Sequence, residues 1–353
     1  MPILNKNKDQ YIQRFLLKWY EKNKRELPWR NIKPNNQANA YYVLVSEFML
    51  QQTTVNTVIK RFNEFIKLWP SIDKLSKISE NRILRFWSGL GYYNRAKNLL
   101  KTIKIISRDF KSKVPQHYDR LIELPGVGDY TAKAILGIAY NHPVLPLDAN
   151  IKRIIARLYG MKTLLRLNKK KIEDIASQYQ SLNKASDLIQ SFMDYGSAIC
   201  LPRNPKCDEC LIEKFCEARK KNIQHLIPFK NLSLEKKKIK FTRAYIVVNN
   251  INEILVNRRK SSGMLASMLE VPNDQWVNKK KLLERNAIYE KVGNKFKYKR
   301  AFTYSFSHFD LDIDIYKTVV KKKMFKDHKW MKTNQIHISG MPTVMKQIIK
   351  KSR

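Results

Sequence analysis

The stretch "LPGVGDYTAKAIL", residues 124–136, contains the glycine-rich turn that is most informative about the fold of this chain. Gly126 and Gly128 permit a tight turn that leaves backbone N–H groups free, and a helix is expected to begin at about Asp129. The free N–H groups and the dipole of such a helix attract phosphate oxygens without reading a base sequence. Alone, such a motif more often marks an ordinary glycine-rich helix connection, so the rest of the chain has to decide.

The chain of 353 residues is too long for one hydrophobic core, so two domains are expected. Residues 10 to about 220 repeat apolar side chains at helical spacing, with residues 41–69 as one clear segment. Beyond about residue 240 the period becomes two, which predicts strands, and the phase slips across Ser307 and His308, where a bulge or turn belongs. We predict a mainly α domain at 1–218, a charged linker at 219–240, and a smaller α+β domain at 241–353.

Charge points to a polyanionic partner. Lys and Arg number 69 against 30 Asp and Glu, a net charge of +39, and nucleic acid is favoured over a membrane because no strongly amphipathic basic helix stands out. A compositional bias towards Lys, Asn, Ile and Tyr is the alternative explanation. The sequence has no membrane-length apolar run and no signal-peptide core at its start, so we expect a soluble, cytoplasmic protein.

All four cysteines lie within 17 residues, at C-x6-C-x2-C-x5-C spacing. Such clustering in an intracellular chain indicates a metal centre and argues against disulfides. Four thiolates can hold either tetrahedral zinc or a [4Fe-4S] cluster, and their chemistry does not choose between the two. The predicted metal ligands are Cys200, Cys207, Cys210 and Cys216.

Two carboxylates stand in contrasting places. Glu47 lies in the apolar run "VSEFMLQQT", residues 45–53, where burial should raise its pKa and make it a possible general acid. Asp148 precedes "ANIKRIIARLYG" and is placed to cap a helix, where backbone donors should keep it ionised. An ionised carboxylate beside a sugar suits an oxocarbenium-like transition state. In either case an ordinary structural role is the alternative.

Taken together, these motifs resemble the endonuclease III and MutY group of DNA glycosylases. The cysteine spacing, "LPGVGDYTAKAIL" and "LPLDANIKR" match the group, and "SEFMLQQTTV" and "GLGYYNRAKNL" resemble the MutY branch of adenine DNA glycosylases. The resemblance is specific from about residue 15 to 218 and weaker beyond. It implies a two-lobed helix-hairpin-helix glycosylase domain with an iron-sulfur loop, one [4Fe-4S] cluster, and a Nudix-like second domain, in which we find no Nudix pyrophosphatase glutamate box.

The resemblance also implies catalytic roles. The glutamate at the position of Glu47 protonates adenine at N7, and the aspartate at the position of Asp148 stabilises the developing cation. Asn150 matches an asparagine that supports the active-site carboxylates or water. Tyr130 stands where the endonuclease III branch has a lysine that forms a Schiff base and cuts the strand. Base removal without an efficient lyase step is therefore expected, although Lys133, one turn along, leaves a weak lyase step open.

Further positions resemble the family's DNA contacts. Gln52 and Tyr92 match the wedge that fills the gap left by an extruded base, and Thr53 and Leu90 lie beside the opposite base. The remaining predicted DNA contacts are Gly126, Gly128, Arg203, Lys206, Phe306, Ser307 and His308, the last three resembling a loop that contacts 8-oxoguanine.

Two local departures from the family pattern matter. Ala149 replaces a usual glycine beside Asp148, and "GMLASMLEVP", residues 263–272, replaces a run based on Gly-Leu-Trp-Gly-Gly. We expect Ala149 to tighten the backbone beside Asp148. We expect the altered run at 263–272 to make the second domain less stable or to change how it docks.

We predict a monomeric, monofunctional adenine DNA glycosylase of base-excision repair, acting on adenine opposite 8-oxoguanine and opposite guanine in double-stranded DNA. One alternative is an endonuclease III-like bifunctional glycosylase and lyase for oxidised pyrimidines, which Tyr130 and the second domain disfavour. The other is an iron-sulfur protein that binds DNA without chemistry, which the joint presence of Glu47, Asp148 and Tyr130 disfavours.

Overall fold

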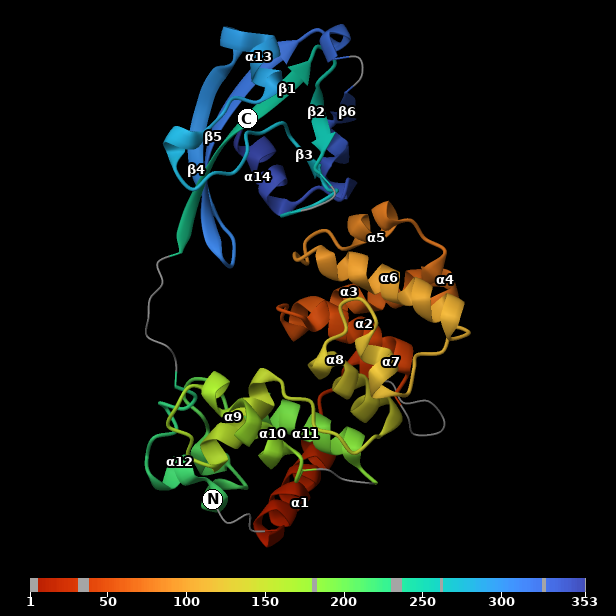
Figure 1. Ribbon diagram of the computed structural model, residues 1–353, viewed down its shortest axis with the longest axis vertical. Helices are drawn as coiled ribbons and strands as arrows, with labels where there is room; N and C mark the ends of the chain where they lie inside the picture. Colours follow the sequence, from red (N-terminus) through yellow and green to blue (C-terminus); the bar gives the residue numbers. More distant parts are fainter. Residues whose placement is uncertain are drawn as a thin grey trace. The chain divides into compact units, whose positions relative to one another are not determined.

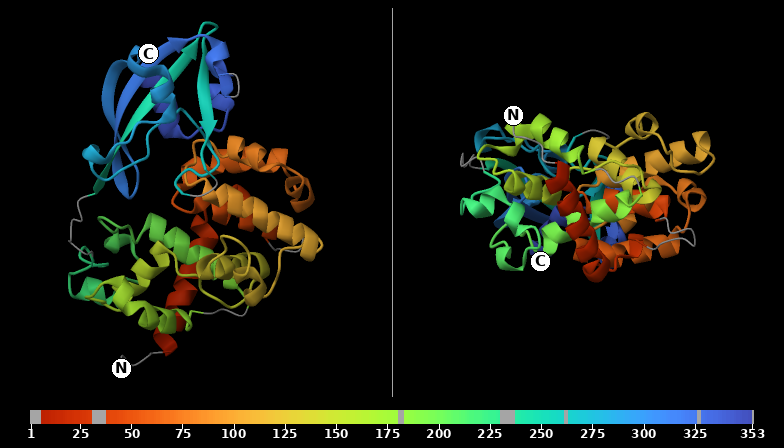
Figure 2. Two further views of the ribbon diagram at one scale, coloured as in Figure 1. Left: turned by 45° about the horizontal axis from the view of Figure 1, so that its top comes forward. Right: turned by 90° about the horizontal axis from the view of Figure 1, so that it is seen from below.

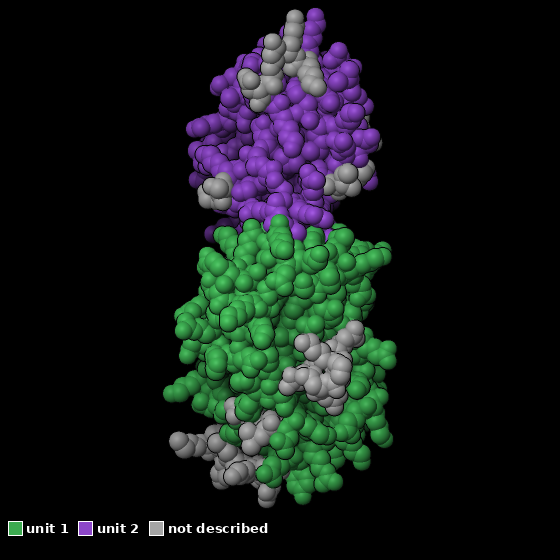
Figure 3. Space-filling model, turned by 90° about the vertical axis from the view of Figure 1, so that its right-hand side faces the viewer, with its two compact units in different colours: residues 1–77, 98–233 green, residues 78–97, 234–353 purple. Residues whose placement is uncertain are grey.

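A computed structural model describes residues 6–30, 38–179, 183–229, 237–260, 263–325 and 328–352 (Figure 1). Residues 230–236 of the predicted linker lie outside these ranges. Two compact units make up the structure: residues 1–77 with 98–233, and residues 78–97 with 234–353 (Figure 3). No helix in the described ranges is long and apolar enough to cross a membrane.

The first unit is helical, as predicted. Its helices are α1 (Lys6–Asn23), α2 (Ala40–Leu50), α3 (Val55–Leu68), α4 (Ile72–Ser76), most of α6 (Asn94–Asp109), α7 (Tyr118–Ile122), α8 (Asp129–Ala134), α9 (Ala149–Leu158), α10 (Lys169–Ala176), α11 (Ala185–Ala198) and α12 (Glu217–Lys220). A π-helical turn, η2 (Ile135–Ala139), continues α8 and contacts both α2 and α11. The first helix, red in Figure 2, packs against α11, which brings distant parts of the chain together.

The predicted helical segment at 41–69 is two helices instead of one. Helix α2 ends at Leu50, and α3 begins after Thr54, whose extended backbone occupies the N-cap position. Between them, Gln52 has a left-handed backbone with φ 56°. Helical periodicity continues across this break, so the apolar pattern alone could not reveal it.

The second unit is built on a six-stranded sheet in which β3-β2-β1-β5-β4 are neighbours and β6 pairs with β2. The strands are β1 (Lys238–Asn249), β2 (Glu253–Arg258), β3 (Leu269–Glu270), β4 (Lys297–Ser305), β5 (Phe309–Val320) and β6 (Lys329–Lys332). The central pair β1 and β5 is parallel, while β4 and β5 form an antiparallel hairpin. The α+β prediction is confirmed, including the β1–β2 hairpin and a closing helix, α14 (Thr343–Lys351).

Two separate clusters of apolar side chains pack against this sheet. On one face, Leu311 and Ile313 of β5 pack in a cluster with Val344 and Ile348 of α14. On the other, Tyr245 of β1 lies in a cluster with residues of α13 (Ala287–Val292). Residues 78–97, which contain α5 (Glu80–Phe86) and the start of α6, belong to this unit.

Candidate active site

Glu47 is a buried carboxylic acid on α2. Nearly the whole helix is buried, and Glu47 itself is only 6% exposed. Burial, with the nearby charge of Asp148, raises the pKa of Glu47 from 4.5 to about 7, although a hydrogen bond from the Tyr130 hydroxyl acts in the opposite direction. The sequence-based expectation of a raised pKa is confirmed. At neutral pH this group can therefore give up a proton or accept one.

Tyr130 reaches Glu47 from the start of α8. The helix begins at Asp129, as predicted, after Gly128 in the N-cap position. Gly126 has φ 81°, and a Cβ there would lie 2.8 Å from the Cβ of Asn98 and 2.9 Å from the Phe48 ring, so both the turn and the packing require glycine. This turn therefore fixes where the helix carrying Tyr130 begins.

Lys133 is held on the exposed side of α8. Its ammonium forms an ion pair of 2.8 Å with Asp129, which also accepts a hydrogen bond of 2.9 Å from the Tyr118 hydroxyl. These two partners lower the pKa of Asp129 overall, although its partial burial acts in the opposite direction. The one amine that the sequence offered for a lyase step on this helix therefore has a carboxylate partner.

Asp148 caps α9, as predicted. Its Oδ1 accepts a hydrogen bond of 2.6 Å from the Ile151 N–H, and its Oδ2 accepts one of 3.0 Å from the Asn150 amide. Burial raises the pKa of Asp148 overall, while these two donors lower it in the direction expected of groups that favour the ionised form. Ala149, the first residue of α9, is exposed and needs no left-handed backbone, so the alanine fits where the family has glycine.

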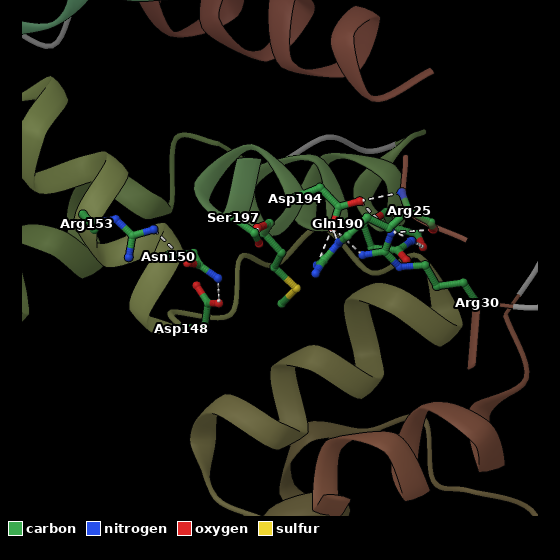
Figure 4. A network of polar contacts seen from close by, with 10 residues as sticks. Arg25, Arg30, Asp148, Asn150, Arg153, Gln190, Asp194 and Ser197 are labelled. Carbon is green, nitrogen blue, oxygen red and sulfur yellow. Dashed lines mark hydrogen bonds and ion pairs between the residues drawn. The ribbon is translucent and has the colours of Figure 1, made fainter. Parts of the chain in front are cut away.

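A chain of hydrogen bonds leads from Asp148 through Asn150 to Arg153 (Figure 4). Arg153, buried on α9, donates to the Asn150 side chain at 2.8 Å, to the Gly196 carbonyl at 2.7 Å and to the Cys200 carbonyl at 2.8 Å. A Cβ on Gly196 would lie 2.6 Å from the Cβ of Asn150, so α11 approaches closely only because this residue is glycine. Arg153 thus joins the candidate catalytic carboxylate to the first cysteine.

The four cysteines line one small cavity of about 30 Å³, together with Arg157. Arg157, only 2% exposed, donates to the Cys200 Sγ at 3.3 Å and to the Leu201 carbonyl at 2.7 Å, and the Tyr195 hydroxyl donates to the Cys210 Sγ at 3.3 Å. Donors aimed at sulfur fit thiolate ligands of a metal centre.

Two further observations bear on this loop. Burial raises the pKa of the Cys210 thiol to about 11, so a metal centre would have to displace its proton on binding. Within the described ranges, no three His, Cys, Asp or Glu side chains are arranged to hold a single metal ion. The four cysteines around one cavity fit a centre bound by four thiolates.

A second polar network of the helical unit was missed in the sequence. Asp194, 1% exposed on α11, accepts hydrogen bonds from Arg25 Nε at 2.7 Å and from Arg30 Nη1 and Nη2 at 2.7 and 2.8 Å (Figure 4). Burial alone would raise its pKa, but the two arginines lower it overall. Both arginines and Gln190 line a cavity of about 790 Å³. None of the predicted catalytic residues lines that cavity, so we assign the site by its carboxylates.

The predicted DNA contacts of the helical unit lie at its surface. Gln52 is exposed and Thr53 half-buried in the break between α2 and α3. Arg203 is exposed, and Lys206 is exposed and pairs with Glu209 at 3.2 Å. Their exposure leaves these side chains accessible to a ligand, whereas the catalytic groups lie deeper.

The second unit brings together the other predicted contacts. Phe306, Ser307 and His308 form the turn between β4 and β5, closed by a hydrogen bond of 2.9 Å from Phe306 N–H to the Phe309 carbonyl. Ser307 and His308 are exposed, as the predicted turn requires. The Tyr92 hydroxyl forms a hydrogen bond with the Ser307 hydroxyl.

Leu90 and Tyr92 differ in exposure. Leu90 is buried, whereas Tyr92 is 39% exposed and has a left-handed backbone with φ 46°. In residues 263–272, the run that departs from the family pattern, Leu265 and Ser267 also have left-handed backbones, with φ 58° and 60°. Side chains other than glycine are strained there.

Comparison with known proteins supports the resemblance. Residues 45–182 match the "HhH-GPD superfamily base excision DNA repair protein" family, and residues 243–351 match the "NUDIX domain" family. The adenine DNA glycosylase of Buchnera aphidicola subsp. Schizaphis graminum is 34% identical over 352 residues, covering 96% of this chain and 98% of that protein. The human adenine DNA glycosylase is 26% identical and covers 95% of this chain and 72% of that protein.

Solved structures agree on the helical fold. A thermostable thymine-DNA glycosylase is similar at a TM-score of 0.55 and 27% identity, covering 61% of this chain and 98% of that one. An endonuclease III–DNA complex gives a TM-score of 0.53 at 20% identity, covering 63% of this chain and all of that one, and shows the fold alone. Since a relative that is 34% identical aligns with nearly the whole chain, this chain belongs to the adenine DNA glycosylase family, the MutY-type branch of the helix-hairpin-helix glycosylases.

Proposed function

We propose that this protein is a monofunctional adenine DNA glycosylase that removes adenine mispaired with 8-oxoguanine, and with guanine, from double-stranded DNA. Adenine-specific N-glycosylase activity in base-excision repair is the activity of its family. One observation in this chain supports the proposal. Glu47 is a buried acid with a pKa of about 7, it is hydrogen-bonded to Tyr130, and the charge of Asp148 contributes to raising its pKa.

In the proposed reaction, protonated Glu47 gives its proton to N7 of the extruded adenine. The bond between C1′ of the sugar and N9 then breaks, and its electron pair leaves with the neutral base. Positive charge develops on the sugar, where ionised Asp148 stabilises it and Asn150 holds the carboxylate in place. Water adds to C1′, and its proton returns to a carboxylate, which leaves an abasic site.

The same geometry supports the proposal that an efficient lyase step is absent. Tyr130 has no amine to form a Schiff base with the sugar, and Lys133 is paired with Asp129. We therefore propose that the strand stays intact after base removal. This separates the proposal from the endonuclease III-like alternative.

Recognition is proposed to use both parts of the chain. We assign the wedge to Gln52 and Tyr92, which are exposed and have left-handed backbones, with Thr53 and Leu90 beside the opposite base. The turn formed by Phe306, Ser307 and His308 reads 8-oxoguanine. The backbone around Gly126 and Gly128, together with Arg203 and Lys206, contacts phosphates.

We further propose that residues 1–218 carry catalysis and residues 241–353 lesion recognition, in a monomer that works on the chromosome in the cytoplasm. Cys200, Cys207, Cys210 and Cys216 would hold one [4Fe-4S] cluster, which fits their shared cavity and the donors of Arg157 and Tyr195. When bound, the cluster would tie the loop together and contribute local charge. The reaction above requires no redox step.

The test is single-turnover cleavage of an end-labelled duplex with adenine opposite 8-oxoguanine, analysed with and without hot alkali. We expect breaks only after alkali, and none with a Glu47→Gln variant. A duplex with an oxidised pyrimidine opposite guanine tests the endonuclease III-like alternative, which predicts breaks without alkali. Tight binding with no adenine loss would refute the proposal and favour a DNA-binding protein without chemistry.

A further inference from the structure

Arg95 is a buried cation that the proposed chemistry does not use. It is 6% exposed, and its Nη2 donates to the Leu90 carbonyl at 2.9 Å and to the Gly91 carbonyl at 3.2 Å. Its guanidinium also lies 5.5 Å from the ring centre of Trp87 and 5.7 Å from that of Tyr92. Burial lowers its pKa to about 10, so it remains charged at neutral pH.

The contacts of Arg95 converge on a short, conformationally demanding turn. Gly89, Gly91 and Tyr92 all have left-handed backbones, with φ 99°, 69° and 46°. Glycine adopts this region freely, but tyrosine does not, so Tyr92 needs external support to stay there. The two carbonyls bound by Arg95 belong to the two residues just before Tyr92, where such support acts directly on its backbone.

The other side of the turn is held by residues of the C-terminal segment in the same unit. The hydroxyl of Tyr92 bonds to that of Ser307, and Lys346 donates to the Ser88 hydroxyl at 2.9 Å. Tyr92 is thus fixed at its backbone by Arg95 and at its tip by the turn proposed to read the lesion.

We propose that Arg95 is a positioning residue for mispair recognition: it holds the turn at residues 88–92 so that Tyr92 is already presented as a wedge when DNA arrives. The inference rests on the wedge role proposed above for Tyr92. A side chain ordered in advance loses less conformational entropy on insertion, so more of the contact energy is available for extruding the base. Arg95 acts only through Tyr92 and touches no reacting atom.

A double-mutant cycle tests this path of action. Single-turnover adenine excision at saturating enzyme is compared for the wild type, Arg95→Met, Tyr92→Ala and the double variant. We expect Arg95→Met to slow excision roughly tenfold in the wild type but less than about twofold in the Tyr92→Ala background, because residues that act as one unit are not additive. Equal losses in both backgrounds would overturn the proposal.

Gly91 gives a second test that leaves the core untouched. A Cβ on Gly91 would meet no atom within 4 Å, so Gly91→Ala disturbs only the backbone conformation at φ 69°. Gly91→Asn is the matched control, since asparagine tolerates this region better than alanine. We expect the alanine variant to behave like Arg95→Met and the asparagine variant to recover most of the rate. Equal rates for the two would argue that the turn conformation is irrelevant.

A fluorescence measurement separates this inference from the proposed function. The variants are remade in the Glu47→Gln chain, which excises nothing, and bound to a duplex with 2-aminopurine next to the target adenine. We expect wild-type residues at 91, 92 and 95 to give a large rise in fluorescence from unstacking, and Arg95→Met to give a small one at saturation. Failure of the wild type to excise adenine would refute the proposed function alone. An undiminished rise in 2-aminopurine fluorescence with Arg95→Met in a folded protein would refute the role of Arg95.

Discussion

Removing the charge of Glu47 should stabilise the protein at high pH while abolishing excision. Its pKa is about 7 in the folded state against an ordinary value of 4.5. The folded state therefore binds more protons than the unfolded state between these values, and stability falls as pH rises through that window. At about 1.4 kcal/mol per pKa unit, the loss amounts to about 3 kcal/mol above pH 7. Glu47→Gln has no such loss.

Urea unfolding of the wild type and Glu47→Gln, followed by far-UV circular dichroism, measures this difference. The stability gained by the variant should grow from under about 1 kcal/mol near pH 5 to about 3 kcal/mol near pH 8.5. Any effect of the amide on packing is independent of pH and drops out of the comparison. Glu64→Gln, which alters a half-exposed carboxylate on α3, serves as the control. Parallel curves for the wild type and Glu47→Gln across this range would refute the reasoning.

Three further outcomes are expected. Tyr130→Phe removes the hydrogen bond that lowers the pKa of Glu47, so the decline of the single-turnover rate at alkaline pH should move to higher pH than in the wild type; an unmoved limb would contradict this. Ser267→Gly relieves a left-handed backbone at φ 60° and should raise the unfolding free energy of the second unit by about 1 kcal/mol in urea titration. A serine-to-glycine change at a position without a left-handed backbone should give no such gain. Arg157→Met leaves the Leu201 carbonyl and the Cys200 sulfur without their donor, so stability should drop by about 3 kcal/mol. If the proposed [4Fe-4S] cluster is bound, its iron and its visible absorbance should be lost as well.

Local signals in the sequence were enough for much of the fold. The start of α8 at Asp129, the cap of α9 by Asp148 and the turn at Ser307 and His308 each depend on residues within a few positions, and each is observed. The burial of Glu47 followed from the apolar residues around it on one helix. Where backbone chemistry and hydrophobic period agree, local sequence determines local structure.

Other features depend on pairing across the chain, which periodicity does not encode. Arg25 and Asp194 are separated by 169 positions, and the sequence around either residue does not predict that the two will pair. The same holds for residues 78–97, which group with the C-terminal segment although they lie within the helical part of the sequence. The burial that raises the pKa of Asp148 was likewise not evident from the residues around it in the sequence.

Gln52 and Tyr92, which the resemblance places in the DNA stack, share a property that no sequence pattern revealed. Both have left-handed backbones, and Gln52 lies just beyond the end of α2 at Leu50. A left-handed backbone costs free energy in a residue other than glycine, and a different residue at the same position could avoid that cost. Eight other non-glycine residues in the described ranges share this conformation, Leu265 and Ser267 among them, so the strain alone assigns no function. At Gln52 and Tyr92 it coincides with positions that the family resemblance places in the DNA stack, and this coincidence is the reason to test them first.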